Sequence, residues 1–278
     1  MELLRPDSAE AVAAALENGA VALAGGTEVV PLIREGILEA DTLVDISNVV
    51  PRGIRSGWIG GGTSLGELEV DPQIPAVLRE ACALAASPQL RAMGTIAGNL
   101  LQATRCWYWR LRFPCRLHGG DHCFAREGEH REHAIFANDF CASAHPSDVA
   151  AALHVLSATL VTSRRRLPIA ELYRLPTHDN RQTTALERDE LILEVEHATP
   201  EASTYLKAMD RSRYAFALVG VAAARFETET ALALTGVAPI PWLIEGPDDL
   251  ERATPLPGNT YKLELAAALV RRALETVA

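Results

Sequence analysis

The sequence predicts a mixed fold of helices and strands in two domains, and three observations support this prediction. A chain of 278 residues is long enough for two domains and a substantial core. Short apolar runs typical of strands alternate with alanine-rich stretches typical of helices. A polar stretch at 176–188 interrupts this alternation. We therefore expect one domain over residues 1–175 and a smaller one over residues 176–278.

The first elements predict a unit in which strands alternate with helices. The alanine-rich segment 8–18 is expected to be a helix, with Ser8 as its N-cap. Segment 20–26, AVALAGG, predicts a short buried strand that ends in a glycine turn. A short helix is then expected over 28–37, and a second strand over 41–49.

A second unit is expected to begin near residue 56. Segment 56–68 predicts a strand with another glycine turn, and segment 75–87 predicts a helix. Segment 91–101, RAMGTIAGNLL, is interrupted by glycines and favours neither helix nor strand. Further on, 147–156 predicts a helix capped by Ser147 or Asp148.

The rest of the chain continues with both kinds of element. Segment 158–173 predicts a strand, a turn and a strand, and its three arginines are expected to lie in a solvated turn. Four later segments are expected to alternate between strand and helix, namely 191–198, 203–212, 214–227 and 230–242. Segment 261–278 predicts a closing helix.

The composition argues against some classes of function. The net charge of −10 argues against nucleic acid as the main partner, because phosphate binding requires a basic surface. No signal peptide is visible at the start, and the longest apolar run, YAFALVGVAAA, is too short to span a bilayer. We therefore expect a cytoplasmic protein without a membrane span. Its five cysteines are then expected to be free thiols or metal ligands rather than disulfides.

Two glycine-rich turns suggest a binding site. Gly25 and Gly26 follow an apolar strand, where glycines let the backbone approach a ligand and point its amides at an anion. Segment 93–99, MGTIAGN, adds two glycines, a threonine hydroxyl and an asparagine amide, and GGGT at 60–63 adds a flexible turn. Two such loops could hold a pyrophosphate from two sides. The pattern is neither G-x-G-x-x-G nor a P-loop, and a glycine pair after a strand is also common in a plain tight turn.

The segment from Thr104 to Asp148 is unusual, because it holds four of the five cysteines: Cys106, Cys115, Cys123 and Cys141. Separations of 8, 7 and 17 residues exclude the C-x(2–4)-C knuckles of structural zinc sites and the common ferredoxin spacings. Four thiolates in a long irregular loop still suit a tetrahedral metal site or an iron–sulfur centre, which would offset the entropy of ordering the loop. The spacing alone does not name the metal, and four unrelated buried thiols are an alternative.

Other residues in and near this segment have simpler interpretations. The four histidines between Arg105 and His133 could be ligands, namely His118, His122, His130 and His133. The polar stretch REGEHREH around the last two favours solvated positions. Cys82 lies in an expected helix and is interpreted as a core thiol. The aromatic run from Trp107 to Trp109 is expected to pack the loop onto the body of the protein.

Six stretches, in order along nearly the whole chain, resemble the FAD-binding (medium) subunit of the xanthine dehydrogenase family of molybdenum hydroxylases. They are LAGGTEVVPLIREG, IGGGTSLGEL, ASPQLRAMGTIAGNLLQ, HPSD, YLKAMDRSRYAFALVGVAAA and GVAPIPW. Each is weak alone, but the combination is specific. The cysteine-rich loop resembles the branch with the flavin subunits of 4-hydroxybenzoyl-CoA reductase and of periplasmic-type bacterial aldehyde oxidoreductases. In that branch an inserted loop carries a [4Fe-4S] cluster.

The resemblance implies an α+β fold. Residues 1–175 would form an FAD-binding domain of the PCMH type. It would consist of two α/β subdomains, at about 1–55 and 56–175, with the cysteine-rich loop at 104–141. A smaller α+β C-terminal domain would follow over residues 176–278.

The resemblance also implies site residues. The backbone of the first glycine turn is expected to cradle the FAD pyrophosphate, through Ala24, Gly25, Gly26, Thr27, Glu28 and Val29. The second wall is expected to come from Thr95, Gly98 and Asn99. Asp148 would lie near the cofactor, and Ile192 and Lys207 would flank the isoalloxazine ring. The four loop cysteines would bind the [4Fe-4S] cluster, and no catalytic residue is expected in this chain.

In the family this chain is an oxidoreductase subunit of a heterotrimer. Substrate reacts at a molybdopterin on a large subunit, and electrons pass through [2Fe-2S] centres on a small subunit to FAD. Ala97 departs from the family pattern, because a second glycine is usual there. A methyl group at that position could crowd the flavin phosphates unless φ is negative. Two alternatives stay open: an FAD-free assembly module stapled by a metal, which Ala97 motivates, and an enzyme with a structural zinc site, which the knuckle-free spacing disfavours.

Overall fold

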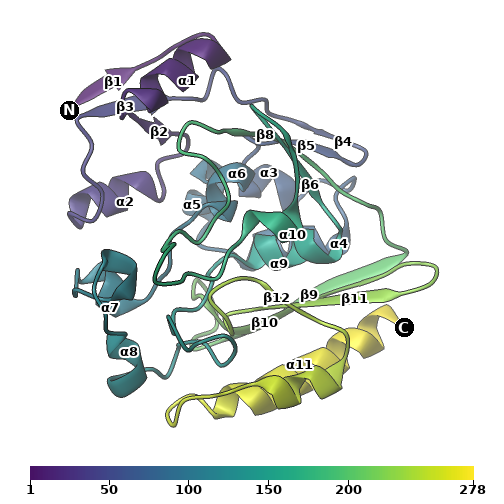
Figure 1. The fold of residues 1–278 in the computed structure, drawn as a ribbon. Coiled ribbons are helices and arrows are strands. Elements are labelled where there is room, and N and C mark those ends of the chain that lie inside the picture. Colours follow the sequence, from purple (N-terminus) through teal and green to yellow (C-terminus); the bar gives the residue numbers. More distant parts are fainter.

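The computed structural model describes all 278 residues, and its strands form three separate sheets (Figure 1). A three-stranded sheet and a five-stranded sheet are built mostly from the N-terminal part of the chain, and a four-stranded sheet from the C-terminal part. The expected mixture of helices and strands is therefore confirmed.

The N-terminal unit is a parallel sheet in the order β1–β3–β2. Helix α1 begins after Ser8, whose side chain accepts a hydrogen bond from the backbone N–H of Ala11 at 3.2 Å. Helices α1 and α2 connect the strands, as parallel pairing requires. The elements are β1 (Glu2–Leu4), α1 (Ala9–Glu17), β2 (Val21–Leu23), α2 (Val29–Arg34) and β3 (Thr42–Asp45).

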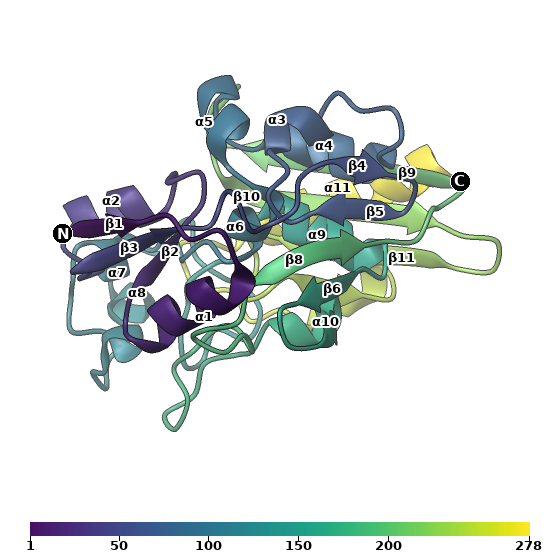
Figure 2. The ribbon, with the colours of Figure 1, turned by 90° about the horizontal axis from the view of Figure 1, so that it is seen from above.

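The five-stranded sheet has the order β4–β5–β8–β6–β7 with antiparallel neighbours, and the small sheet lies to one side of it (Figure 2). Strand β8 follows the expected domain boundary at 176, yet it pairs with β5 and β6. The chain therefore leaves this sheet only after Glu196, because pairing between distant strands brings β8 back. The strands are β4 (Ile54–Arg55), β5 (Trp58–Gly60), β6 (Thr159–Thr162), β7 (Arg166–Pro168) and β8 (Ile192–Glu196).

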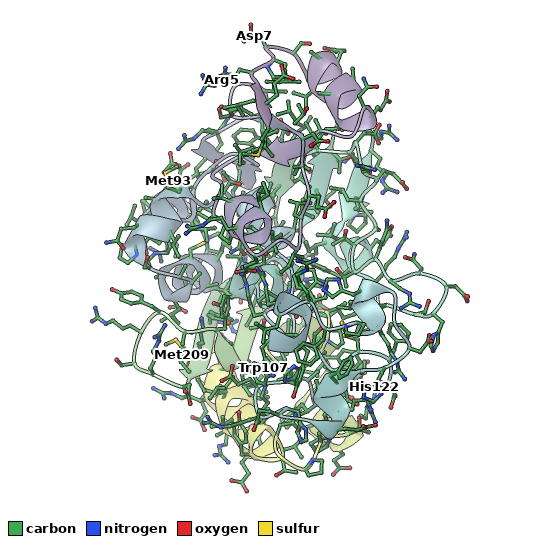
Figure 3. All side chains as sticks on the ribbon, turned by 90° about the vertical axis from the view of Figure 1, so that its left-hand side faces the viewer. Arg5, Asp7, Met93, Trp107, His122 and Met209 are labelled. Atoms are coloured by element: carbon green, nitrogen blue, oxygen red, sulfur yellow. The ribbon has the colours of Figure 1, made fainter.

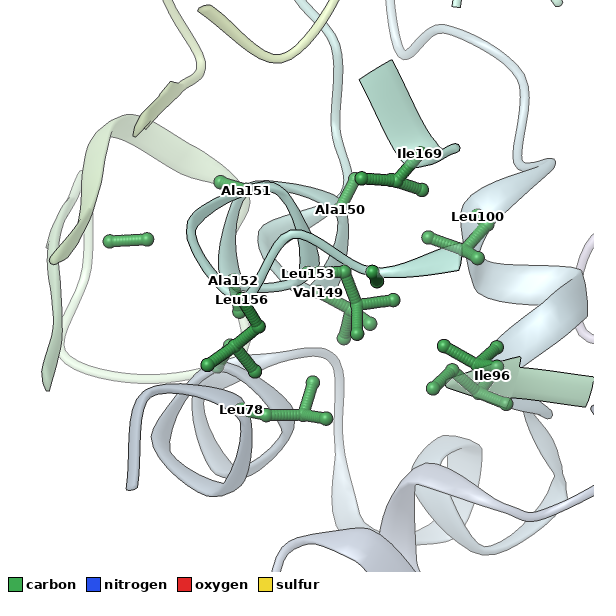
Figure 4. Packing of buried hydrophobic residues seen from close by; sticks show 14 of the residues in the cluster. Leu78, Ile96, Leu100, Val149, Ala150, Ala151, Ala152, Leu153, Leu156 and Ile169 are labelled. Carbon is green, nitrogen blue, oxygen red and sulfur yellow. The ribbon is translucent and has the colours of Figure 1, made fainter. Parts of the chain in front are cut away.

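Short helices fill the space around this sheet, and α9 lies in the middle of the largest core (Figure 4). The glycine-punctuated segment 91–101 contains the end of one helix and all of another, α5 and α6. A helix, α10, also replaces the second half of the strand expected near 169. The helices are α3 (Leu65–Leu68), α4 (Ala76–Leu84), α5 (Pro88–Met93), α6 (Ile96–Leu100), α9 (Asp148–Val155) and α10 (Ile169–Leu172).

The four-stranded antiparallel sheet has the order β12–β11–β10–β9 and is covered on both faces. Val219 and Val221 of β10 belong to the core shared with α11, while Ala222 and Ala224 belong to the core shared with α4 and α9. The segments from 191 to 242, which were expected to alternate, all contain strands instead. The elements are β9 (Ala202–Met209), β10 (Ala217–Arg225), β11 (Thr230–Thr235), β12 (Trp242–Ile244), the 3₁₀-helix η2 (Pro247–Arg252) and α11 (Tyr261–Val277).

The cysteine-rich loop contains only short helical pieces, on the left of Figure 1, and its residues Ile135 and Phe136 pack into the core with β10 and α11. The helical pieces are α7 (Trp107–Arg110), the 3₁₀-helix η1 (Arg116–His118) and α8 (Phe124–Glu127). Neither these pieces nor any other helix of the chain has both the length and the apolar character needed to cross a membrane.

Candidate functional site

A cleft of about 800 Å³ lies between the small sheet and the five-stranded sheet, a size typical of sites for small molecules and cofactors. Three chain segments form most of its lining. They are the turn after β2, the segment around the start of α6, and the stretch 183–192 that leads into β8. The cleft is therefore built by segments far apart in the sequence.

The two glycine turns meet in this cleft through their backbones. A Cβ atom on Gly25 would lie 1.7 Å from the carbonyl oxygen of Met93, so only glycine allows this approach. Gly26 next to it has a φ of +71°, in the left-handed region that favours glycine. The expected pairing of the two loops around one space is therefore present in the structure.

The second wall is held by a network of backbone hydrogen bonds. Thr95 caps α6, because its hydroxyl accepts a hydrogen bond from the N–H of Gly98 at 3.1 Å. The N–H of Ala97 donates to the carbonyl of Gly61 at 3.1 Å, which ties the wall to the GGGT turn. Ala97 lies inside α6 and has no positive φ, so the backbone accepts its methyl group without strain.

Most of the residues expected to bind the cofactor line this cleft, and three do not. The lining includes Ala24, Gly25, Gly26, Thr27, Glu28, Val29, Thr95, Gly98 and Ile192. Asn99, Asp148 and Lys207 lie outside it. The side-chain oxygen of Asn99 instead accepts a hydrogen bond from the hydroxyl of Ser147 at 2.6 Å, next to the start of α9.

Asp148 and Lys207 form a buried ion pair between α9 and β9, with the ammonium nitrogen 2.6 Å from the carboxylate. Tyr205 donates a hydrogen bond to the other carboxylate oxygen at 2.5 Å, and Lys207 also donates to the carbonyl of Leu84 at 3.0 Å. Burial raises the pKa of Asp148, while the neighbouring ammonium opposes that shift. This pair fixes the four-stranded sheet to the helices beneath it, and its part in flavin binding stays a prediction.

Several other lining residues carry no signal in the sequence. Asp45 is the last residue of β3 and Ser47 follows the strand. The carboxylate of Asp45 accepts hydrogen bonds from the N–H and the hydroxyl of Ser47 at 3.0 and 2.6 Å. The hydrogen bonds from Ser47 lower the pKa of Asp45. The carboxyl ends of parallel β2 and β3 meet at one edge, and that topology could have pointed to Asp45.

The four loop cysteines converge on one small pocket, although up to 17 residues separate neighbouring ones. Cys115, Cys123 and Cys141 are only 7–8% exposed, and none of the four forms a disulfide. Apolar side chains complete the lining, including Leu117, Phe124 and Ala125. Cys82 is buried in α4 within the main core and does not line this pocket, as expected.

The sulfur atoms of this pocket lie close enough to influence one another. Burial raises the pKa of Cys106 to about 11 and that of Cys141 to about 12, and nearby thiols add to both shifts. No three His, Cys, Asp or Glu side chains are placed around a common point as a single metal ion requires. The four thiols therefore line one pocket without forming a preassembled site for a single metal ion.

Polar groups already point at two of these sulfurs. The backbone N–H groups of Trp109 and Tyr108 interact with the sulfur of Cys106, and Nε2 of His133 lies 3.2 Å from the same atom. The sulfur of Cys141 lies 3.3 Å from the hydroxyl of Ser143. Such groups are typical neighbours of metal-bound thiolates, because they stabilise negative charge on sulfur.

The other loop histidines make contacts elsewhere. His118 stacks on Trp109 at 5.3 Å between ring centroids, and His122 lies 3.5 Å from the carboxylate of Glu127. His130 accepts a hydrogen bond from the N–H of Gly258 at 2.9 Å. The expectation of solvated positions is therefore wrong for His133, which is 2% exposed because it packs under the aromatic run.

The cleft and the cysteine-rich loop are joined directly. The carboxylate of Glu28, in the first glycine turn, pairs with Arg105 at 2.5 Å and with Arg110 at 2.6 Å. On the other side, Arg181 donates hydrogen bonds to the carbonyls of Arg116 and Gly120. Figure 3 shows this side of the molecule, with Met93 above Trp107 and His122.

Comparison with known proteins supports a flavin site. Residues 1–197 match the family described as the FAD binding domain in molybdopterin dehydrogenase. The aldehyde oxidoreductase FAD-binding subunit PaoB of Escherichia coli strain K12 is 36% identical over 281 aligned residues, which cover 89% of this chain and 88% of PaoB.

Solved structures share the fold over the whole chain. Carbon monoxide dehydrogenase from Hydrogenophaga pseudoflava has a chain with a TM-score of 0.73 and 23% identity, covering 100% of this chain and 96% of that one. Quinoline 2-oxidoreductase from Pseudomonas putida 86 gives a TM-score of 0.68 and 18% identity, with coverage of 100% and 96%. At these identities the two likenesses show the fold alone.

Proposed function

The chain belongs to the family of FAD-binding domains in molybdopterin dehydrogenases, and we propose that it is the electron-transfer flavin subunit of a molybdenum hydroxylase or dehydrogenase complex. In this role it passes electrons between iron–sulfur centres and an external acceptor. The observation that carries the proposal is the cleft, which two glycine turns build by direct backbone contact.

The cleft suits FAD in both shape and chemistry. The backbone from Ala24 to Val29 offers amides to the pyrophosphate, and Thr95 and Gly98 form the opposite wall. Ile192 lines the cleft, which supports its proposed contact with the isoalloxazine ring. Bound FAD supplies the electron-transfer chemistry, while these residues bind it, orient it and exclude water.

In this proposal, three residues support the cleft indirectly: Asn99, Asp148 and Lys207. Asn99 holds Ser147, the N-cap of α9, and the ion pair of Asp148 with Lys207 joins α9 to β9. These contacts position the base of the cleft without lining it.

The four cysteines of the loop fit a [4Fe-4S] cluster. The four cysteines line one pocket with apolar walls, and none of them forms a disulfide. Four cysteine thiolates are the usual ligands of such a cluster. We therefore assign Cys106, Cys115, Cys123 and Cys141 as its ligands. A cluster would stabilise the loop and supply an electron-transfer centre.

The proposed partners are a large subunit with molybdopterin and a small subunit with [2Fe-2S] centres. The name of PaoB, a subunit of an aldehyde oxidoreductase, supports an assembly of this kind. The two alternatives from the sequence are weaker. The helical position of Ala97 removes the reason for an FAD-free module, and the absence of a C-x(2–4)-C knuckle disfavours structural zinc.

Affinity purification of the tagged chain from its source tests this assembly. Two partner chains, one with molybdenum and one with [2Fe-2S] signals in electron paramagnetic resonance (EPR), should co-purify with it. Oxidation of an aldehyde or a purine by the isolated chain with an artificial acceptor would overturn the proposal, because the proposed molybdenum site lies on the large subunit.

A further inference from the structure

His133 is the one histidine of the chain with a hydrogen-bond contact to a cysteine. Its Nε2 atom lies 3.2 Å from the sulfur of Cys106, and the side chain is buried. Cys141 also has a polar neighbour, because its sulfur lies 3.3 Å from the hydroxyl of Ser143. His133 therefore has a specific place at the edge of the thiol pocket.

The ring is held in this place from several sides. Trp107 packs edge-on against it, with 4.6 Å between ring centroids. The backbone N–H of His133 donates to the carbonyl of His130 at 3.0 Å, and the side-chain amide of Asn259 donates to the carbonyl of His133 at 3.1 Å. The contact with Cys106 is thus enforced by the surrounding structure.

The pattern of hydrogen bonds decides which ring nitrogen carries the proton. Nδ1 is buried and has no partner. An unpaired N–H in the interior is rarer and costs more than an unpaired acceptor, so Nδ1 is left without a proton and Nε2 carries it. A metal-bound cysteine is deprotonated, so its sulfur can only accept a hydrogen bond.

We propose that His133 donates a hydrogen bond from Nε2 to the Cys106 sulfur and thereby raises the reduction potential of the cluster held by the four cysteines. The inference rests on the proposed [4Fe-4S] site. Reduction adds negative charge that spreads onto the cysteine sulfurs, and an N–H donor stabilises the reduced state more than the oxidised one. His133 acts through Cys106 and is a positioning residue.

The test is a redox titration of the purified complex. It is monitored through the EPR signal that disappears in a Cys106→Ala variant. His133→Phe keeps the ring packing against Trp107 and removes the donor. In this variant we expect the reduction equilibrium of the cluster to shift about tenfold toward the oxidised form. For a one-electron couple, this corresponds to a reduction potential that is about 59 mV lower. His133→Gln retains an N–H donor and should restore most of the potential. His118→Gln, at an exposed ring on Trp109, should change nothing.

The outcomes separate this inference from the proposed function. Equal potentials in the wild type and His133→Phe, with iron content unchanged, would overturn the role of His133. If the phenylalanine variant loses iron while the glutamine variant keeps it, the donor is needed to hold the cluster, which supports the contact. Loss of iron from both variants would show that packing of the imidazole matters rather than the hydrogen bond. A wild-type complex with no more iron than the Cys106→Ala variant would instead remove the cluster itself.

Discussion

At Gly25 the two walls of the cleft touch through backbone atoms alone. A side chain there would collide with the carbonyl of Met93, so Gly25→Ala must push the walls apart. We expect a destabilisation of about 1–3 kcal/mol and loss of bound flavin. Flavin absorbance and thermal unfolding measure the two effects.

Gly246→Ala is the matched control for this change, because no atom lies within 4 Å of its added Cβ and its φ of −174° is extended. The Gly246→Ala variant should retain bound flavin and unfold at the same temperature as the wild type. Full flavin retention in Gly25→Ala would show that the walls of the cleft are not in contact in solution.

The buried side chain of His145 makes the free energy of unfolding depend on pH. Burial lowers its pKa to about 3, and its Nδ1 accepts a hydrogen bond from the N–H of Ser147 at 3.3 Å. The unfolded chain, with a histidine pKa near 6.5, binds more protons between these values. Stability is therefore complete above about pH 6.5 and falls below it, by up to about 1.4 kcal/mol per pH unit.

His145→Asn keeps an acceptor near Nδ1 but cannot be protonated in this range. Urea unfolding at pH 7 and pH 5 should show a smaller loss of stability on acidification in the variant than in the wild type. The same loss in both would mean that His145 is protonated with an ordinary pKa in the folded protein.

Among the elements, the first turn of α2 connects the cleft to the cysteine-rich loop. Glu28 pairs with Arg105 and Arg110, and its side chain is 16% exposed. Glu28→Gln leaves both guanidinium groups without their main partner, and we expect a loss of about 1–3 kcal/mol. Faster hydrogen exchange over 103–111, together with weaker retention of both FAD and iron, should follow.

Glu35→Gln is the control at this junction. Glu35 contacts the same Arg110 at 3.1 Å, but it is 41% exposed and makes a salt bridge worth about 0–1 kcal/mol. If the two variants behave alike, the link between cleft and loop does not run through Glu28.

Elements with strong local signals were predictable, and the shortest ones were not. Ser8 and the alanines after it predicted α1, because a cap and helical composition are properties of adjacent residues. Helices α5, α6 and α10 have only four to six residues, and tertiary contacts rather than propensity hold them. Strand β8 could not be placed from composition, because its partners lie far away in the sequence.

For the whole molecule, the sequence pointed to most of the residues that line the cleft but not to how distant segments pack together. The two glycine turns could be recognised because glycine has a distinctive backbone freedom. The burial of Asp148 with Lys207 depends on how α9 and α4 pack against the four-stranded sheet, which no local pattern reveals. The sequence did group the four loop cysteines, but their spacing matches no standard knuckle, so only the folded loop shows that they line one pocket.

The most direct test of the central claim is the cofactor content of the anaerobically purified complex, measured per copy of this chain. We expect about one FAD and about four irons in the thiol pocket, counted as the difference from a Cys106→Ala variant that still holds FAD. Cys82→Ala, in the main core, should keep both cofactors. One zinc per chain in the absence of this iron, or a folded complex with no FAD, would contradict the claim.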